Sequence, residues 1–225
     1  MKPRFVGRLG VADVVTVANA TLGFLAAFVA TLSPELAARL LLVASIADAL
    51  DGILARRFGG TAAGEYLDAL AAVSSFAVAP AVLVAVVVVD AWGYGEPTAW
   101  LGVAVAGLYV AMAVTRLGLY TAYDSDVRAT EGTQTTLAAT VLAAGVLAGF
   151  VEPGVLVVVT GVLAVLMVTT FRYPDLHAQD AAVMGLVQAA AVLTRGWLGR
   201  GFAFALLFLS VAYLLLGPAF YWSNN

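Results

Sequence analysis

Long apolar runs follow one another along almost the whole chain, and they constrain its fold more than any other feature. A membrane-spanning helix needs about 20 mostly apolar residues. Eight such runs, the seventh being the weakest, lie near residues 11–32, 35–57, 64–89, 97–122, 134–151, 154–172, 180–194 and 200–221. They lack the strict alternation of an outer-membrane barrel. We therefore predict an all-α integral membrane protein, a polytopic helical bundle of about seven to eight transmembrane helices. Residues 1–225 are expected to form a single transmembrane domain.

The composition excludes most other classes of protein. Hydrophobic residues make up 63% of the chain and charged residues 11%, against about 45–50% and about 25% in soluble domains. The net charge of −3 leaves no basic excess for a phosphate backbone, so no nucleic-acid partner is expected. Cysteine is absent, which excludes disulfides, thiolate metal sites and a cysteine nucleophile.

Basic residues predict the orientation, because cytoplasmic loops of membrane proteins carry an excess of lysine and arginine. With the N-terminus inside, most of them lie at or near the cytoplasmic side: Lys2, Arg4, Arg8, Arg56, Arg57, Arg116, Arg128 and Arg172. The others fall outside: Arg39, Arg195 and Arg200. Trp92 and Trp100 flank the outer ends of the third and fourth runs, and Trp222 follows the last, as interfacial tryptophans do. We predict a cytoplasmic N-terminus.

Three aspartates lie deep in the apolar runs or at their inner ends. Each must face the bundle interior, a partner charge or a wet cavity, because a carboxylate beside lipid is costly. Asp48 and Asp51 are three residues apart, which places them on one face of a helix, and Asp68 lies one turn into the next helix. One explanation is structural, as an ion pair with Arg56 or as helix caps. The other is an oxygen-rich site, which suits hard cations such as Mg²⁺ or Mn²⁺.

The residues around the acids favour the second explanation. Glycines such as Gly52 and Gly64 remove side chains where a backbone or a ligand must come close. Arg56 is a fixed cation suited to a phosphate. We therefore predict a site for metal-dependent phosphate chemistry at the cytoplasmic face. A membrane transporter that uses buried acids is the alternative from another class. The clustering of the acids within residues 48–68, rather than along a pathway, argues against it.

Residues 48–72 carry a longer pattern, D-A-L-D-G-I-L-A-R-R-F-G-G-T-A-A-G-E-Y-L-D-A-L-A-A. This segment resembles the signature D-x2-D-G-x2-A-R-x7–8-G-x3-D-x3-D of the CDP-alcohol phosphatidyltransferases. Seven positions match in type and spacing: Asp48, Asp51, Gly52, Ala55, Arg56, Gly64 and Asp68. At the last position the family has a fourth aspartate and this chain has Ala72.

Further segments narrow the resemblance to one branch of that family. The run S-F-A-V-A-P at residues 75–80 is similar to the S-F-G-V-A-P run of phosphatidylserine synthases. Weaker similarities to these synthases occur, in the same order along the chain as in the synthases, at residues 16–24, 115–117, 166–176 and 213–218. Together these segments resemble a phosphatidylserine synthase, a CDP-diacylglycerol–serine O-phosphatidyltransferase, or its archaeal counterpart, an archaetidylserine synthase.

The resemblance implies an activity, a set of partners and a location. A phosphatidyl or archaetidyl group would pass from CDP-diacylglycerol or CDP-archaeol to the hydroxyl of L-serine, with release of CMP, in phospholipid biosynthesis. The three aspartates would hold Mg²⁺ or Mn²⁺. The nucleotide would be bound by Gly52, Ala55, Arg56 and Gly64, helped by Thr16 and Asn19. The protein would be a homodimer in the cell membrane, with its active site facing the cytoplasm.

Position 72 is where the resemblance places the general base that deprotonates the acceptor hydroxyl. Ala72 has three explanations: a substitution of the original aspartate, an inactive homologue, or a base displaced to Glu65. Glu65 lies two helical turns from Ala72, about 10 Å along the axis, so the displaced base fits least. Loss of a general base typically removes about 10²–10⁴ in rate, so the chain is expected to be inactive or impaired.

The acceptor site is less defined. Arg116 could bind the serine carboxylate, or it could snorkel to the interface. Ser75 could line the acceptor pocket or pack helices together, and Thr133, Thr135 and Thr136 could close a pocket or cap a helix. Inositol phosphate and glycerol phosphate are the alternative acceptors within the family, although a phosphorylated acceptor would need several arginines.

Overall fold

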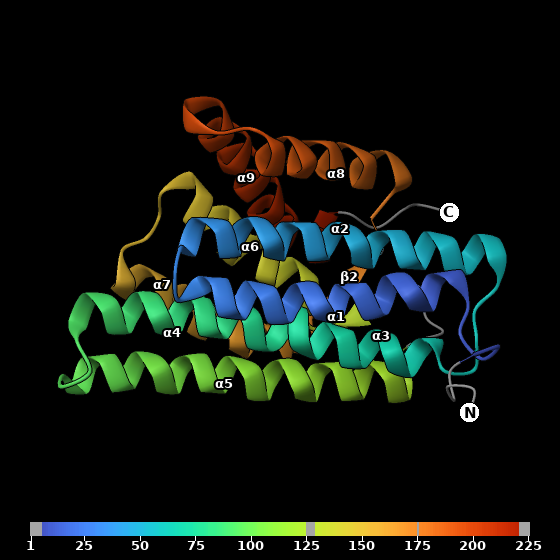
Figure 1. Ribbon diagram of the computed structural model, residues 1–225, viewed down its shortest axis with the longest axis horizontal. Helices are drawn as coiled ribbons and strands as arrows, with labels where there is room; N and C mark the ends of the chain where they lie inside the picture. The colour runs from blue at the N-terminus through green and yellow to red at the C-terminus, as the bar shows by residue number, and fades with distance from the viewer. Residues whose placement is uncertain (1–5, 125–128, 175, 221–225) are drawn as a thin grey trace.

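The computed structural model describes residues 6–124, 129–174 and 176–220, which form a bundle of helices (Figure 1). The elements are α1 (Val11–Ala30), α2 (Pro34–Phe58), α3 (Gly64–Ala72), η1 (Val73–Val78), α4 (Ala79–Trp92), α5 (Pro97–Leu119), η2 (Tyr120–Asp124), β1 (Ala129–Glu131), α6 (Thr135–Ala148), α7 (Pro153–Met167), β2 (Arg172–Pro174), α8 (Ala178–Leu193) and α9 (Gly196–Phe220). η1 and η2 are π-helices, and β1 pairs antiparallel with β2. Part of the predicted orientation depends on residues outside the described ranges: Lys2, Arg4, Arg128 and Trp222.

The prediction of an all-helical membrane protein is confirmed. Each predicted run corresponds to a helical segment of the described chain, and α3, η1 and α4 form one continuous helix. Helices that are long and apolar enough to cross a membrane cover Val11–Ala30, Gly64–Trp92, Pro97–Tyr123 and Gly196–Phe220. α2, with 25 residues, is also long enough to cross a membrane. It is not among these apolar helices because it carries most of the charges of the predicted site. This helix therefore brings polar chemistry into an apolar bundle.

Two of the predicted spans are shorter than expected. α6 has 14 residues and α7 has 15, which gives about 21–23 Å of helix against an apolar membrane core of about 30 Å. α6 ends at Gly149, whose φ of 98° is left-handed. After α7 the chain leaves the helix and runs beside the segment before α6, where the backbone N–H of Gly132 donates to the carbonyl of Phe171 at 2.8 Å. The expected spans 134–151 and 154–172 are therefore wrong in length.

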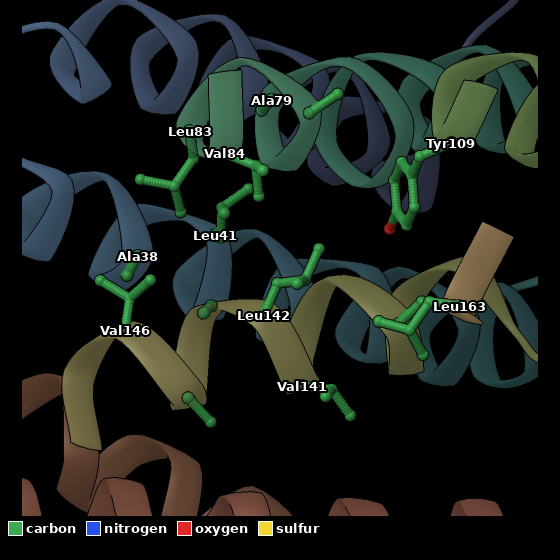
Figure 2. Close-up of a cluster of buried hydrophobic side chains, with 14 of the residues drawn as sticks. Ala38, Leu41, Ala79, Leu83, Val84, Tyr109, Val141, Leu142, Val146 and Leu163 are labelled. Atoms are coloured by element: carbon green, nitrogen blue, oxygen red, sulfur yellow. The ribbon is translucent and has the colours of Figure 1, made fainter. Parts of the chain in front are cut away.

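The core is organised around α6, which is buried on nearly all sides. Its residues Leu142 and Val146 point toward α2, where Leu41 and Ala38 lie, and Val141 points to the other side of α6 (Figure 2). α6 also packs against α9, which ties the last helices to the rest of the bundle. Because a short buried helix needs no lipid-facing surface, α6 occupies the centre while longer helices surround it.

α1 approaches the π-helix η1 closely at Gly23. A Cβ atom at this position would lie 2.7 Å from backbone atoms of Ser74 and Ser75. The contact also carries hydrogen bonds, since the Ser74 hydroxyl donates to the carbonyl of Ala20 at 3.0 Å. Small residues commonly allow this kind of backbone contact between membrane helices. Gly23 therefore sets the distance between α1 and the helix that follows the predicted signature.

We expect Gly23→Ala to destabilise the protein by about 1–3 kcal/mol, because the new methyl group collides with backbone that cannot turn aside. Tryptophan fluorescence during thermal unfolding of the detergent-solubilised chain measures this as a lower Tm. Gly107→Ala is the matched control, since Gly107 is also helical and a Cβ there meets nothing within 4 Å. Equal Tm values for the two variants would contradict the proposed close contact.

Candidate active site

The predicted acids meet at one end of the bundle, beside a cavity of about 350 Å³. Asp48 comes from the second half of α2 and Asp68 from α3, and both line the cavity. Asp51 is buried next to them but is not part of the cavity lining. The three carboxylates are close enough to interact electrostatically. The structure therefore brings together in space the acids that the sequence spacing groups.

Side chains from α1 and α6 supply hydrogen bonds to these carboxylates. The Thr136 hydroxyl of α6 donates to Asp48 Oδ2 at 3.2 Å, and Asn19 Nδ2 of α1 approaches Asp48 Oδ1 at 3.4 Å. The Thr16 hydroxyl donates to Asp51 Oδ2 at 2.7 Å. Thr16 and Asn19, predicted to help bind nucleotide, thus contact the acids themselves. Thr136 does not cap α6, whose N-cap residue is Gln134.

The chemistry of this donor set fits a divalent cation that prefers oxygen ligands. Besides the carboxylates, Asn19 Oδ1 is fully buried and has no hydrogen-bond partner within the described ranges. Among the residues that the structure describes, no group of three His, Cys, Asp or Glu side chains is close enough together to hold a metal ion. The residues that could hold such a cation are therefore identified by their oxygen ligands and their shared location at the end of the bundle.

Arg56 lines the same cavity without pairing with the acids. Its guanidinium lies over Gly52, where a Cβ would be 3.5 Å from Nη1. No salt bridge joins Arg56 to a carboxylate in the part of the chain that the structure describes. The acids do not cap α2 or α3 either, since the capping residues there are Gly59 and Ala63. The geometry thus disfavours both structural explanations and leaves a cation facing the cavity.

Asp13 connects the start of α1 to the loop before α3. Its place in the first turn suggests a helix N-terminal residue, and its Oδ2 accepts from the Gly10 N–H at 2.7 Å. The same oxygen accepts from the Thr61 hydroxyl at 2.8 Å, and Gly64 packs beside Oδ1. Ala55 contributes a backbone carbonyl, which accepts from the Gly59 N–H where α2 ends. Gly64 and Ala55 therefore shape the turn between the two helices that carry the acids.

The helix changes to π geometry directly after Ala72, and a proline explains the change. Pro80 has no N–H, so the carbonyl of Phe76 four residues earlier loses its helical donor. The Tyr109 hydroxyl of α5 donates to that carbonyl at 3.0 Å, and both residues are fully buried. The Ala79 N–H donates to the carbonyl of Ser74, five residues earlier, as in a π-helix, rather than to the residue four earlier as in an α-helix. Such π segments frequently occur at functional sites.

The extra residue of the π turn decides where Ser75 points. Its hydroxyl donates to the carbonyl of Asn19 at 2.8 Å, and the side chain is fully buried against α1. Ala72 lines the cavity together with Asp68, whereas Ser75 is outside the lining. Glu65 is exposed and also lines the cavity. Ser75 therefore contacts the backbone of Asn19 and does not line the cavity.

Arg116 faces the cavity from α5 and is only 6% exposed. Its Nη2 approaches the Thr130 hydroxyl at 3.4 Å, and its guanidinium lies 5.5 Å from the centre of the Tyr120 ring. This placement is inconsistent with a side chain that snorkels along the lipid face. Thr135 also lines the cavity, whereas the Thr133 hydroxyl donates to Tyr173.

Four polar residues of the cavity wall were not predicted: Tyr120, Thr121, Thr130 and Gln134. They come from the end of α5 and from the segment before α6, which lie far in sequence from residues 48–72. In the sequence, the one feature that indicates a polar site near them is Arg116, close to the end of the fourth apolar run.

Comparison with known families identifies the class of protein. The family model for CDP-alcohol phosphatidyltransferase matches residues 9–172, which include every residue of the cavity wall. The chain therefore belongs to the CDP-alcohol phosphatidyltransferase family. This is a family of membrane transferases in phospholipid biosynthesis that use a CDP-alcohol as the donor and generally depend on a divalent metal. No curated protein sequence matches the chain. The family supports a transferase rather than a transporter.

We expect Tyr109→Phe to destabilise the protein by about 1–3 kcal/mol, because it leaves the buried carbonyl of Phe76 without a donor. Thermal unfolding in detergent measures the loss. Tyr94→Phe, which removes a hydroxyl from a residue that is 75% exposed, is the control. The prediction fails if Tyr109→Phe unfolds at the same temperature as the unmodified chain.

Proposed function

We propose that this protein transfers a phosphatidyl or archaetidyl group from CDP-diacylglycerol or CDP-archaeol to the hydroxyl of L-serine, releasing CMP. The observation that carries the proposal is the single cavity lined by Asp48, Asp68, Arg56, Arg116 and Ala72. It offers acids, two cations and the position of the expected base in one place. With Ala72 at that position, we propose that turnover by this chain is impaired.

The donor end of the cavity binds the CDP group in this proposal. Arg56 pairs with a phosphate, since its guanidinium lies over Gly52 and forms no salt bridge with an acid of the described residues. Gly52, Ala55 and Gly64 form the backbone cradle for the nucleotide, and Thr16 and Asn19 support it from α1. Asp48, Asp51 and Asp68 are the residues that would hold Mg²⁺ or Mn²⁺. The ion, when bound, neutralises negative charge that develops on the leaving CMP.

The reaction is a displacement at the phosphorus that carries the lipid. The serine oxygen forms a bond to this phosphorus, and the bond from phosphorus to the bridging oxygen of CMP breaks. CMP leaves with that electron pair, and the proton of the serine hydroxyl must pass to a base. A carboxylate at position 72 would lie on the cavity wall one turn after Asp68, where it could accept the proton. Ala72 provides no such group.

The charges of the cavity favour serine over phosphorylated acceptors. Arg56 and Arg116 are the basic side chains among the described residues that line it. If Arg56 binds the donor, Arg116 remains for the acceptor, which suits a single carboxylate better than the dianion of inositol phosphate or glycerol phosphate. Ser75 supports α1 in this proposal and does not touch the acceptor.

We further propose that residues 1–225 form one transmembrane domain, since α8 and α9 pack on α2 and α6 beyond the family match. The cavity end faces the cytoplasm in this proposal. Among the described residues, this end has more arginines than the other end, as expected for the cytoplasmic side. They are Arg8, Arg56, Arg57, Arg116 and Arg172. A homodimer in the plasma membrane completes the proposal on the basis of the family.

We expect Ala72→Asp to raise serine-dependent CMP release from a CDP-lipid by about 10²–10⁴-fold, because it supplies the missing general base. The assay uses detergent-solubilised protein with Mn²⁺ and compares serine with inositol phosphate and glycerol phosphate. Ala69→Asp is the matched control: it adds the same charge to the same cavity wall but away from the expected position.

Each outcome of this assay has a definite meaning. Equal turnover with and without Ala72→Asp would place the base elsewhere, and Glu65 would be the next residue to change. Turnover with a phosphorylated acceptor but not with serine would overturn the acceptor. Failure of the protein to bind CDP-lipid at all would overturn the proposed function.

We also expect Asp48→Asn to weaken Mn²⁺ binding at least about tenfold, because removing a charged oxygen ligand costs at least as much as losing an outer-shell partner. Electron paramagnetic resonance of free Mn²⁺ measures this without any turnover, and chelation with EDTA gives the baseline. Asp90→Asn, on an exposed position of α4, should leave binding unchanged. Unaltered affinity of Asp48→Asn would remove Asp48 from the ligand set.

A further inference from the structure

A second polar cavity, of about 330 Å³, lies at the end of the bundle opposite to the acids. It is lined by Glu35 and Arg39 at the start of α2 and by Trp197 and Arg200 at the start of α9. Figure 1 places the corner between α8 and α9 at the end away from the N-terminus, with the turns that join α1 to α2 and α4 to α5. Of the three arginines predicted to lie on the outer side, Arg39 and Arg200 therefore line the same cavity.

Arg39 is held rigidly at this cavity. Its Nη1 donates to the carbonyls of Ala191 and Thr194 at 2.9 Å each, where α8 ends. Positively charged side chains stabilise the carbonyl end of a helix. The guanidinium therefore has a fixed position, and a ligand that reaches it has little side-chain entropy to overcome.

Arg200 brings a second positive charge to the same cavity. Neither Arg39 nor Arg200 forms a salt bridge with a carboxylate in the described chain, although Glu35 lines the cavity with them. Arg200 also lies near the N-terminal end of α9, where the helix dipole disfavours a cation. With two arginines and one glutamate among the described residues of its lining, this cavity carries a net positive charge.

Tryptophans place this cavity at the depth of lipid head groups. Trp92 ends α4, Trp100 lies in the first turn of α5, and Trp197 lines the cavity while remaining 81% exposed. Such residues mark the boundary between apolar membrane and water. Guanidinium groups at this depth suit the phosphates of anionic head groups.

We propose that the cavity bounded by Arg39, Trp197 and Arg200 binds a phosphate group carried by an anionic lipid or by free phosphate. Bidentate hydrogen bonding to phosphate oxygens is the chemistry that guanidinium groups favour. The site is separate from the proposed reaction, because Arg39 and Arg56 are 17 residues apart on one helix, about 26 Å along its axis.

The experiment is native mass spectrometry of the full chain in detergent, with phosphatidylglycerol or inorganic phosphate as the probe and zwitterionic phosphatidylcholine as the control lipid, which should be retained less than phosphatidylglycerol. We expect Arg200→Gln to lower retention of the phosphate-bearing anion about tenfold, the loss of one charge-assisted hydrogen bond. Arg195→Gln is the matched control, since Arg195 is also exposed at the same corner but does not line the cavity.

The probes separate the two sources of phosphate. Arg200-dependent retention of phosphatidylglycerol, not displaced by inorganic phosphate, identifies a lipid site, and displacement identifies a site for free phosphate. Equal retention by Arg200→Gln and Arg195→Gln, or no retention of either probe by the unmodified chain, overturns the proposal. CDP-lipid binding at the acid cavity should be the same in both variants, so this test is independent of the proposed function.

Discussion

Three carboxylates have to be kept together inside a bundle made mostly of apolar side chains, and much of the structure follows from that constraint. Thr16 and Asn19 turn one face of α1 toward the acids, and Thr136 does the same from α6. These donors hold α1 and α6 at hydrogen-bonding distance from the acids of α2. The polar contacts therefore define how the first helices pack, and the apolar core fills the space around them.

The second determinant is the close contact of backbones that this packing requires. α1 can reach η1 only because Gly23 has no side chain, and η1 exists because Pro80 removes a helical hydrogen bond that Tyr109 replaces. Ser75, which follows Ala72 by three residues, is thereby turned to bond the carbonyl of Asn19. The same residue, Asn19, thus joins the π-helix through its backbone and Asp48 through its side chain.

The sequence was sufficient to predict the class of fold, most helix positions and the acids, because each depends on short-range patterns. Apolar runs define helices, and an i,i+3 spacing places Asp48 and Asp51 on one face. The lengths of α6 and α7 could not be predicted, since they depend on contacts such as Gly132 with residues after α7. The orientation of Ser75 depends on a π turn, and the cavity residues Thr130 and Gln134 come from a segment that only folding brings near.

An alanine at position 72, where the family signature has an aspartate, affects the charge of the cavity and its chemistry in different ways. The cavity already has Asp48, Asp68 and Glu65 on its walls, and these repel one another. A fourth acid would increase that repulsion unless a cation were bound, so an alanine is the easier residue to accommodate in the fold. Arg56, Arg116 and the donors from α1 do not depend on position 72. In the function that we propose, binding of a CDP-linked lipid and its turnover rest on separate parts of this cavity, so Ala72 impairs turnover and leaves the proposed binding residues in place.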